Sequence, residues 1–313
     1  MMEMTLATSG FGMPRDGDLF IGSIRERCES YIDAGIWAGI DRPQLRIWMN
    51  QFSEGPERYF AACILDSLLY RTTPQTVALL EQLFQRSLPD LARKNELMPG
   101  KEDLWLECLM CDSSSGDPGI RIVPVVKDND RPTKSALLIA RMYKQHLRID
   151  ERFVIWHWDI PKARQSGASA FLFVDDFLGT GSQFMRFTSR FEIPSTLAGA
   201  IAIYAPFVAH DAGIKKLTDE AKWLHICWAE RLSASYNLFS ESSLVFNDGA
   251  NSPEAAKEFY LEILHRKQLQ IDKIYIYGYG GLALTYVFEH ATPNNNIPLL
   301  WHKDNYWEPL FRR

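Results

Sequence analysis

Long apolar runs and paired cysteines are both scarce in this sequence. No hydrophobic stretch approaches the roughly 18 residues that a membrane helix needs, because the longest, LAGAIAIYAPFVA, is interrupted by Pro206. The opening residues MMEMTLATSGFGMPRDGD offer neither the basic region nor the apolar segment of a secretory signal. We therefore expect a chain that does not enter a membrane and resides in the cytoplasm.

The five cysteines are odd in number and scattered, a usage typical of a reducing compartment. Cys108 and Cys111 form one CxxC pair, but zinc needs about four ligands and no second pair accompanies them. We interpret the pair as core thiols, with metal binding or redox chemistry as the alternative. His157 and His225 stand inside apolar runs, and we interpret both as core histidines rather than general bases.

The excess of acidic over basic residues is also small, since the formal net charge is -5. We therefore expect no overall basic surface for binding nucleic acid. A local basic patch is the alternative. With 46% hydrophobic and 23% charged residues, the composition is typical of a globular protein with a substantial core.

The sequence pattern changes after Arg121, beyond a connecting region at residues 95–120 that is rich in Gly, Pro, Ser and Asp. We expect a loose, polar arm over residues 1–18 and a helical module over 19–100, in which apolar residues recur every three or four positions. The first helix of this module is expected to begin after Ser23 as a cap. We interpret it as a packing or interaction module, with a winged-helix-like segment as the alternative. An α/β domain is expected over 101–313.

Within that domain, short apolar runs alternate with amphipathic stretches. The runs that we expect to be strands are 122–126, 153–158, 170–174, 200–204, 224–229, 273–277 and 297–301. The stretches that we expect to be helices are 133–147, 182–191, 213–223, 252–269 and 282–290. This alternation indicates an α/β fold with a mainly parallel sheet and helices on both faces, preceded by the helical module.

One stretch, FLFVDDFLGTGSQF at residues 171–184, combines acids with a glycine-rich turn. Its apolar strand ends in Asp175 and Asp176, and parallel sheets bind ligands at the carboxyl ends of their strands. The loop that follows consists of Gly179, Thr180, Gly181 and Ser182. Its glycines allow a tight turn with N–H groups facing an anion, and the helix expected next adds positive potential. The pattern therefore favours phosphate binding.

Acids beside a phosphate loop suit a ligand with two chemically different ends. A sugar phosphate would present its phosphate to the loop and its hydroxyls to Asp175 and Asp176. A divalent cation, held indirectly by the two acids, would mediate part of this contact. The alternative is an aspartate that only caps the turn after the strand.

Residues 175–181 resemble the signature of type I phosphoribosyltransferases, in which an apolar strand precedes two acids, two variable residues and a loop with Thr-Gly. The resemblance implies that Asp175 and Asp176 are catalytic and contact the ribose hydroxyls of phosphoribosyl pyrophosphate (PRPP). It implies that residues 179–183 cradle the 5-phosphate and that Mg²⁺ accompanies PRPP, without an organic cofactor. Gln183 departs from the Thr or Ser of the salvage enzymes.

The same resemblance implies an earlier loop that binds pyrophosphate. Residues 127–134 follow the strand expected at 122–126 and occupy that place. Pyrophosphate contacts are therefore expected from Lys127, Arg131 or Lys134, with a basic surface loop as the alternative.

A second glycine-rich turn follows the strand expected at 273–277. It contains Gly278, Tyr279 and Gly280, and we expect it to form the floor of a base pocket or a second phosphate loop. Tyr279 would stack on a base, with core packing as the alternative.

The end of the chain, GYGGLALTYVFEHATPNNNIPLLWHKDNYWEPLF, narrows the resemblance. Together with the loop and the helical segment, it is similar to a divergent group of phosphoribosyltransferase-like effectors of bacterial conflict systems, some encoded beside retron reverse transcriptases. The similarity covers roughly residues 40–313. It implies an anti-phage effector that binds PRPP or a related ribose-phosphate nucleotide and transfers or releases a ribosyl-phosphate group.

The same similarity implies the partners. They are a neighbouring reverse transcriptase, its RNA or DNA product, or a small winged-helix protein. Self-association into an oligomer is a further alternative. The alternative function is a catalytically degenerate subunit that senses a nucleotide or binds a partner. The aromatic carboxyl-terminal tail is expected to dock on its own chain, with contact to a partner as the alternative.

Overall fold

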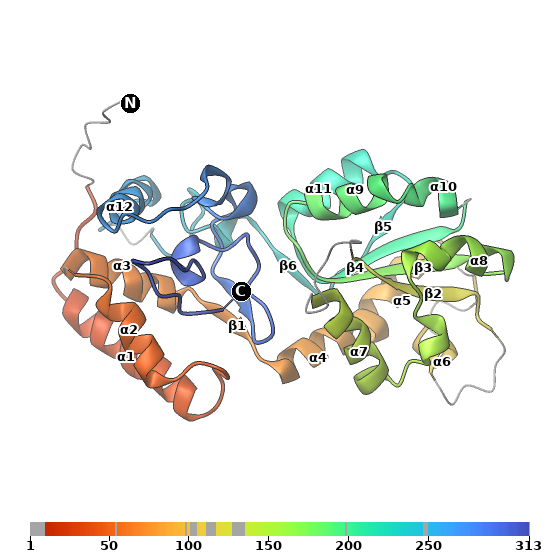
Figure 1. Ribbon diagram of the computed structural model, residues 1–313, viewed down its shortest axis with the longest axis horizontal. Helices are drawn as coiled ribbons and strands as arrows, with labels where there is room; N and C mark the ends of the chain where they lie inside the picture. The colour runs from red at the N-terminus through yellow and green to blue at the C-terminus, as the bar shows by residue number, and fades with distance from the viewer. Residues whose placement is uncertain are drawn as a thin grey trace. The chain divides into compact units, whose positions relative to one another are not determined.

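The computed structural model describes residues 10–53, 55–97, 99–100, 105–110, 117–126, 135–197, 199–246 and 250–312. The chain forms two compact units. In Figure 1, where the colour follows the residue number, the red and the blue ends of the chain belong to the same unit. The first combines Met1–Thr73 with Ser233–Arg313, and the second is Pro74–Leu232. These units differ from the expected division into 19–100 and 101–313, because the two ends of the chain share one core.

The second unit is built on a parallel sheet. The strands are β2 (Ile120–Pro124), β3 (Ala170–Leu178), β4 (Ile201–His210), β5 (His225–Ile226) and β6 (Glu230–Leu232). They form a five-stranded sheet in the order β2-β3-β4-β5, with β6 pairing with β4, and every one of these pairings is parallel. The central strand β3 pairs with β4 from Ala170 opposite Ile201 to Leu178 opposite Ala209.

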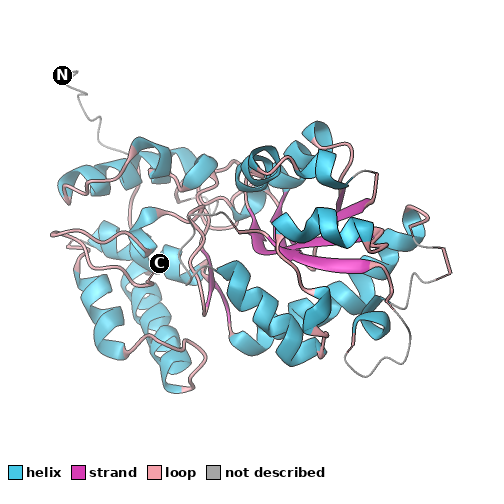
Figure 2. Cartoon of the chain, turned by 45° about the vertical axis from the view of Figure 1, so that its right-hand side comes forward, coloured by secondary structure: helices cyan, strands magenta, loops and turns pink. Residues whose placement is uncertain are grey.

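Helices cover both faces of this sheet (Figure 2). Tyr143 of α7 (Ser135–Leu147) stacks on Phe207 of β4, on one face. On the other face, a hydrophobic cluster joins the sheet to α8 (Ile160–Gln165), α9 (Ser182–Arg190), α10 (Ile193–Leu197) and α11 (Asp211–Glu220). The remaining elements of this unit are α4 (Thr73–Gln82), a π-helical turn at Leu83–Ser87, α5 (Leu88–Lys94) and α6 (Trp105–Leu109). The predicted α/β fold with a helix-flanked parallel sheet is confirmed.

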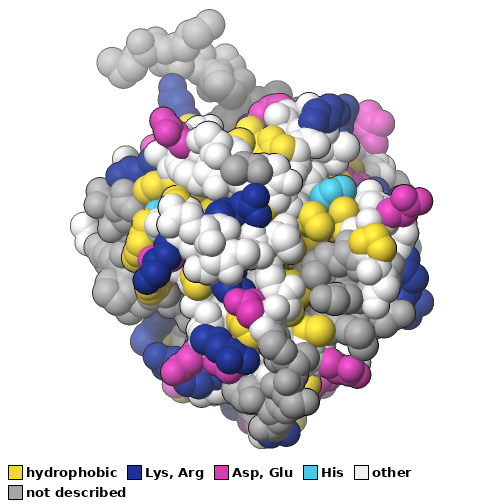
Figure 3. All heavy atoms as spheres, turned by 90° about the vertical axis from the view of Figure 1, so that its right-hand side faces the viewer, with side chains coloured by type: hydrophobic (Ala, Val, Ile, Leu, Met, Phe, Trp, Pro, Cys, Tyr) yellow, Lys and Arg dark blue, Asp and Glu magenta, His cyan; other side chains and the backbone are white. Residues whose placement is uncertain are grey.

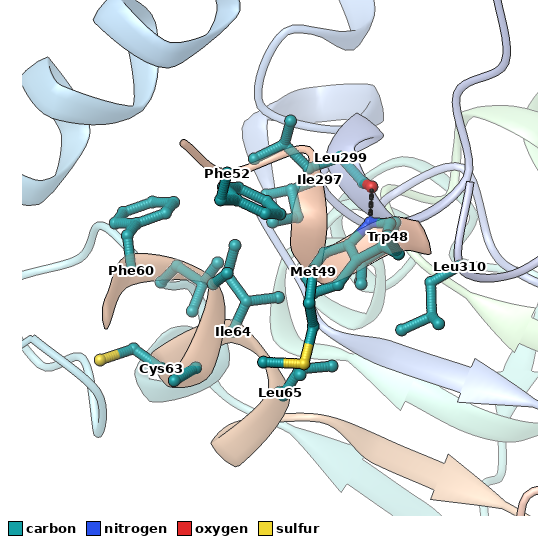
Figure 4. Packing of buried hydrophobic residues seen from close by; sticks show 14 of the residues in the cluster. Trp48, Met49, Phe52, Phe60, Cys63, Ile64, Leu65, Ile297, Leu299 and Leu310 are labelled. Atoms are coloured by element: carbon teal, nitrogen blue, oxygen red, sulfur yellow. Dashed lines mark hydrogen bonds between the residues drawn. The ribbon is translucent and has the colours of Figure 1, made fainter. Parts of the chain in front are cut away.

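The first unit packs helices from the start of the chain against its end. Its elements are α1 (Gly17–Asp33), α2 (Arg42–Asn50), α3 (Gly55–Asp66), β1 (Leu69–Arg71), α12 (Pro253–Arg266) and β7 (Tyr286–Phe288). β1 and β7 pair in parallel, with Tyr70 opposite Val287. In its core, the Trp48 indole N–H donates to the Leu299 carbonyl at 2.7 Å (Figure 4). This long-range packing places residues 233–313 with the first helices.

Part of the arm expected to be loose is docked. Phe11 is buried and stacks on Phe259 of α12, with ring centroids 4.7 Å apart. The Gly12 N–H donates to Oδ1 of Asn251 at 3.0 Å, and α1 begins at Gly17 rather than after Ser23. The prediction of a loose arm was wrong for these residues because Phe11 finds an aromatic partner about 250 positions away; residues 1–9 lie outside the described part of the chain.

Three of the expected strands are wrong. Residues 153–158 overlap two 3₁₀ turns, Glu151–Phe153 and His157–Asp159, and contribute an isolated bridge from Val154 to Ile122. Residues 273–277 begin as a 3₁₀ turn because the Asp272 carboxylate accepts from the Ile274 N–H. Residues 297–301 also form a 3₁₀ turn, with Pro298 at its start.

The helix expected over 282–290 is wrong as well, since residues 286–288 are strand β7. β-Branched and aromatic residues suit a strand, and β1 supplies the partner that a sequence pattern cannot reveal. By contrast, the helices expected at 182–191, 213–223 and 252–269 exist as α9, α11 and α12.

The carboxyl-terminal tail is docked on the first unit. Trp307 and Leu310 are buried, and the Trp307 indole N–H donates to the Leu299 carbonyl at 3.1 Å. Gln51 holds the tail on its outer side, because its Oε1 accepts from the Glu308 N–H at 2.7 Å. The expectation of a docked tail is confirmed for these residues.

No helix among the described residues is both long and apolar enough to cross a membrane. The face drawn in Figure 3 carries hydrophobic, basic and acidic side chains side by side, without a broad region of one charge. Cys108 is a free thiol, while Cys111, its partner in the CxxC pair, lies outside the described residues.

Candidate functional site

The acid pair lies inside strand β3 rather than after it. The strand runs from Ala170 to Leu178, and Asp175 pairs with Pro206 of β4. Asp175 is 3% exposed and Asp176 is 8% exposed. Both carboxyls therefore lie near the carboxyl end of the central strand, where parallel sheets bind ligands, but they are more enclosed than a strand-end turn would make them.

Asp175 is bonded within the protein. Its Oδ2 accepts from the Tyr204 hydroxyl at 3.1 Å, and its Oδ1 accepts from the Asp176 N–H at 3.0 Å. Burial and the neighbouring Asp176 carboxylate raise the pKa of Asp175 well above its ordinary value, because both disfavour the charged form. The surroundings of Asp175 therefore differ from those of Asp176, although the sequence pattern gives the two acids the same role.

The glycine loop leads directly into α9. Gly181 is the cap residue and has φ 75°, in the left-handed region that favours glycine. The first N–H groups of a helix have no partner within the helix, and they carry its partial positive charge. Ser182 and Gln183 begin the first turn of α9, and the Ser182 N–H donates to Oγ1 of Thr180 at 3.5 Å. A glycine turn before a helix N-terminus is a backbone arrangement that can bind an anion, and phosphate binding by residues 179–183 stays a prediction.

Helix α11 packs closely behind this loop. A Cβ built on Gly213 of α11 would lie 2.5 Å from the Gly179 carbonyl oxygen, and one built on Gly181 would lie 3.3 Å from the Leu217 side chain. The loop thus rests on the first half of α11, and Figure 1 shows α9 and α11 side by side. Contacts this close leave the loop little freedom to move.

Lys216 of α11 adds a positive charge that the sequence analysis missed. Its Nζ donates to Oγ of Ser182 at 3.1 Å, which places the ammonium beside the start of α9. A cation is unfavourable next to the positive end of a helix unless an anion joins them. The two glycines, at 179 and 213, bring the helices together, and only the folded chain reveals this proximity.

His210 is the second polar residue that the sequence analysis did not single out. It ends β4 and caps α11, where its Nδ1 accepts from the Ala212 N–H at 3.1 Å. Nδ1 is therefore unprotonated and the ring carries its proton on Nε2. His210 is buried and stands at the carboxyl end of the strand next to β3.

The sequence analysis named two further groups of candidate site residues. Lys127, Arg131 and Lys134, the expected pyrophosphate contacts, lie outside the described residues. Gly278, Tyr279 and Gly280 belong to the first unit. There the Tyr279 N–H donates to the Asn294 carbonyl at 2.7 Å, and the Asn295 side chain donates to the Tyr279 carbonyl at 2.7 Å. These bonds give the second glycine turn a structural partner in the Pro-Asn-Asn segment, and its role in a base pocket stays a prediction.

The two histidines interpreted as core residues differ from each other. His157 is buried, and its ring centroid lies 3.8 Å from that of Phe191. His225 is half-buried on β5, and this burial lowers its pKa. No group of three or more His, Cys, Asp or Glu side chains among the described residues is arranged to hold a metal ion.

The family model of PRTase-CE matches residues 45–313. The chain therefore belongs to this phosphoribosyltransferase-like family, which confirms the coarser part of the resemblance drawn from residues 175–181. Comparison with curated proteins gave no match, and comparison with solved structures gave none.

Proposed function

We propose that the second unit binds PRPP or a related ribose-phosphate nucleotide and transfers or releases its ribosyl-phosphate group. The observation that carries this proposal is the buried acid pair next to a helix-capping glycine loop, with Lys216 bonded to Ser182 at 3.1 Å. The family to which the chain belongs supports the same ligand class.

In this proposal the loop and the acids hold opposite ends of the ligand. The phosphate accepts hydrogen bonds from the N–H groups at the start of α9, from Thr180 and Ser182, and from the Lys216 ammonium. Asp176 accepts a hydrogen bond from a ribose hydroxyl, while Asp175 stays bonded to Tyr204. The Asp176 carboxylate stabilises positive charge that develops at C1 as the C1–O bond to pyrophosphate breaks, and a nucleophile then forms the new bond to C1. Catalysis therefore comes from positioning and electrostatics.

Mg²⁺ enters as part of the substrate. The described residues offer a carboxylate pair rather than a full set of protein ligands, and Mg²⁺ commonly binds through one or two carboxylates together with substrate phosphates. It would supply charge neutralisation of the pyrophosphate, and Asp176 would help to orient it. No organic cofactor is part of the proposal.

A thermal shift experiment tests the ligand class. Ribose 5-phosphate, and PRPP with Mg²⁺, are expected to raise the melting temperature with rising concentration, because a ligand that binds only the folded state stabilises it. Ribose without phosphate is the matched control and is expected to leave the melting temperature unchanged. Equal melting temperatures with all three compounds would reject the proposal.

The alternative is a subunit that binds the same ligand without turnover. Gln183, in place of the Thr or Ser of salvage enzymes, motivates it. Pyrophosphate release from PRPP, measured with a panel of acceptor bases and nucleotides, separates the two. Release above background that depends on Asp176 supports an enzyme, while binding without release supports the sensing subunit.

Lys216→Met is expected to weaken binding of both inorganic phosphate and ribose 5-phosphate about five- to tenfold, since a charge-assisted hydrogen bond to a half-exposed phosphate is lost. The loss should shrink at high salt, which screens this charge. Lys215→Met is the matched control, because Lys215 is exposed on the next position of α11. Equal affinities for the two variants would contradict a role for Lys216.

We propose further that the protein is an effector of a bacterial anti-phage defence system of the retron-associated kind. Its partners would be a neighbouring reverse transcriptase, the RNA or DNA product of that enzyme, or a small winged-helix protein, in the cytoplasm. The family membership supports the phosphoribosyltransferase-like part of this proposal, and the resemblance drawn from the sequence motivates the defence role. A reverse transcriptase gene beside this gene would support the defence role, whereas a neighbourhood of nucleotide salvage genes would speak against it.

A further inference from the structure

Tyr204 contacts both halves of the candidate site from inside the sheet. It lies on β4 opposite Phe173 of β3 and is 1% exposed. Its hydroxyl donates to Oδ2 of Asp175 at 3.1 Å. Its ring stacks on Phe184, with ring centroids 4.0 Å apart and an interplanar angle of 21°.

Phe184 carries this contact to the phosphate loop. It is the third residue of α9, directly after Ser182 and Gln183, and its ring also meets that of Phe173 at 5.9 Å. Buried rings in close contact move little relative to one another. The position of Tyr204 therefore sets where the start of α9 lies above the sheet.

Asp175 carries the other contact to Asp176. Its Oδ1 accepts from the Asp176 N–H at 3.0 Å, while Oδ2 is held by Tyr204. The backbone at Asp176 thus depends on a carboxyl group that Tyr204 holds in place. Removing the hydroxyl would leave a buried carboxyl with one hydrogen-bond donor fewer, which frees it to reorient.

We infer that Tyr204 is a positioning residue that fixes the spacing between Asp176 and the loop 179–182, so that the site selects a pentose phosphate over phosphate alone. The inference rests on the proposed function, because it concerns the ligand of the same site. A ligand held at two ends requires both contacts at a set distance. Inorganic phosphate requires only the loop and is indifferent to that distance.

Tyr204→Phe tests the inference because the ring remains and only the hydroxyl is lost. We expect the affinity for ribose 5-phosphate to fall about tenfold, the size of one lost hydrogen bond, and the affinity for inorganic phosphate to change less than about twofold. Tyr143→Phe is the matched control. Tyr143 is fully buried in the same unit, and its hydroxyl has no hydrogen-bond partner among the described residues, so both affinities should stay unchanged.

The outcomes separate this inference from the proposed function. A wild-type protein that binds neither compound would overturn both. A wild-type protein that binds both, with a Tyr204→Phe variant that loses both equally or neither, would overturn only the positioning role. If Tyr204→Phe does not fold by circular dichroism, Phe184→Leu replaces it. This variant removes the stacked ring, is expected to show the same selective loss, and would overturn the inference if it did not.

Discussion

Asn296→Ala is expected to lower the free energy of unfolding of the first unit by about 3 to 5 kcal/mol. Asn296 is fully buried. Its Oδ1 accepts from the Tyr286 N–H at 2.5 Å, and its Nδ2 donates to the carbonyls of Tyr286 and Pro293, each at 2.7 Å. The side chain thus pairs with β7 as a neighbouring strand would. Its removal takes the partner from the buried N–H and carbonyl of Tyr286, each a separate cost, while the Pro293 carbonyl still accepts from the Asn296 backbone N–H at 3.2 Å.

Asn294→Ala is the matched control for that prediction. It also removes an asparagine amide, two positions earlier, but this side chain is half-buried and takes no part in the hydrogen bonds of Asn296. It should therefore change the free energy of unfolding by less than about 0.5 kcal/mol. Urea unfolding, followed by the fluorescence of the tryptophans of the first unit, measures both. Similar losses for the two variants would contradict the role given to Asn296.

Gly213→Ala is expected to destabilise the second unit by about 2 kcal/mol and to weaken phosphate binding at least tenfold. Glycine to alanine in a helix normally stabilises a protein by about 0.5 to 1 kcal/mol. Here the sign reverses, because the new Cβ would meet the Gly179 carbonyl oxygen at 2.5 Å and the Leu178 Cδ1 at 2.7 Å. The phosphate loop must move to make room, and it carries the groups that bind the anion.

Gly22→Ala provides the opposite expectation in α1. A Cβ at Gly22 would meet nothing within 4 Å, so the substitution should be neutral or stabilising. Chemical unfolding together with a titration of inorganic phosphate measures both variants. Phosphate affinity that survives Gly213→Ala unchanged would show that α11 does not determine the loop position.

The sequence predicted the parts of the fold that local patterns determine. Apolar runs gave β2, β3 and β4, and capping residues gave helices such as α12, where the Ser252 side chain accepts from the Ala255 N–H. The association of the two chain ends in the first unit escaped prediction because it depends on long-range contacts. The partner of β7 is β1, more than 200 positions away, and the run 297–301 supplies a core for Trp48 rather than a strand.

The candidate site shows the same limit. The loop 179–182 and the acid pair could be predicted because their residues are contiguous in the sequence. Lys216 and His210 could not be predicted in the same way. The lysine reaches Ser182 only because two helices approach closely at Gly213. The difference between Asp175 and Asp176 was also hidden, since it depends on Tyr204 from the neighbouring strand.

The central claim is that the second unit binds a ribose phosphate through Asp176 and the loop 179–182. Calorimetric titration of PRPP with Mg²⁺ into the wild-type protein and Asp176→Asn tests it most directly, because this substitution removes one negative charge and keeps the shape of the side chain. We predict saturable binding to the wild type and an affinity at least tenfold lower for the variant, about 1.4 kcal/mol or more. No binding to the wild type, or equal affinity for the two proteins, would contradict the account.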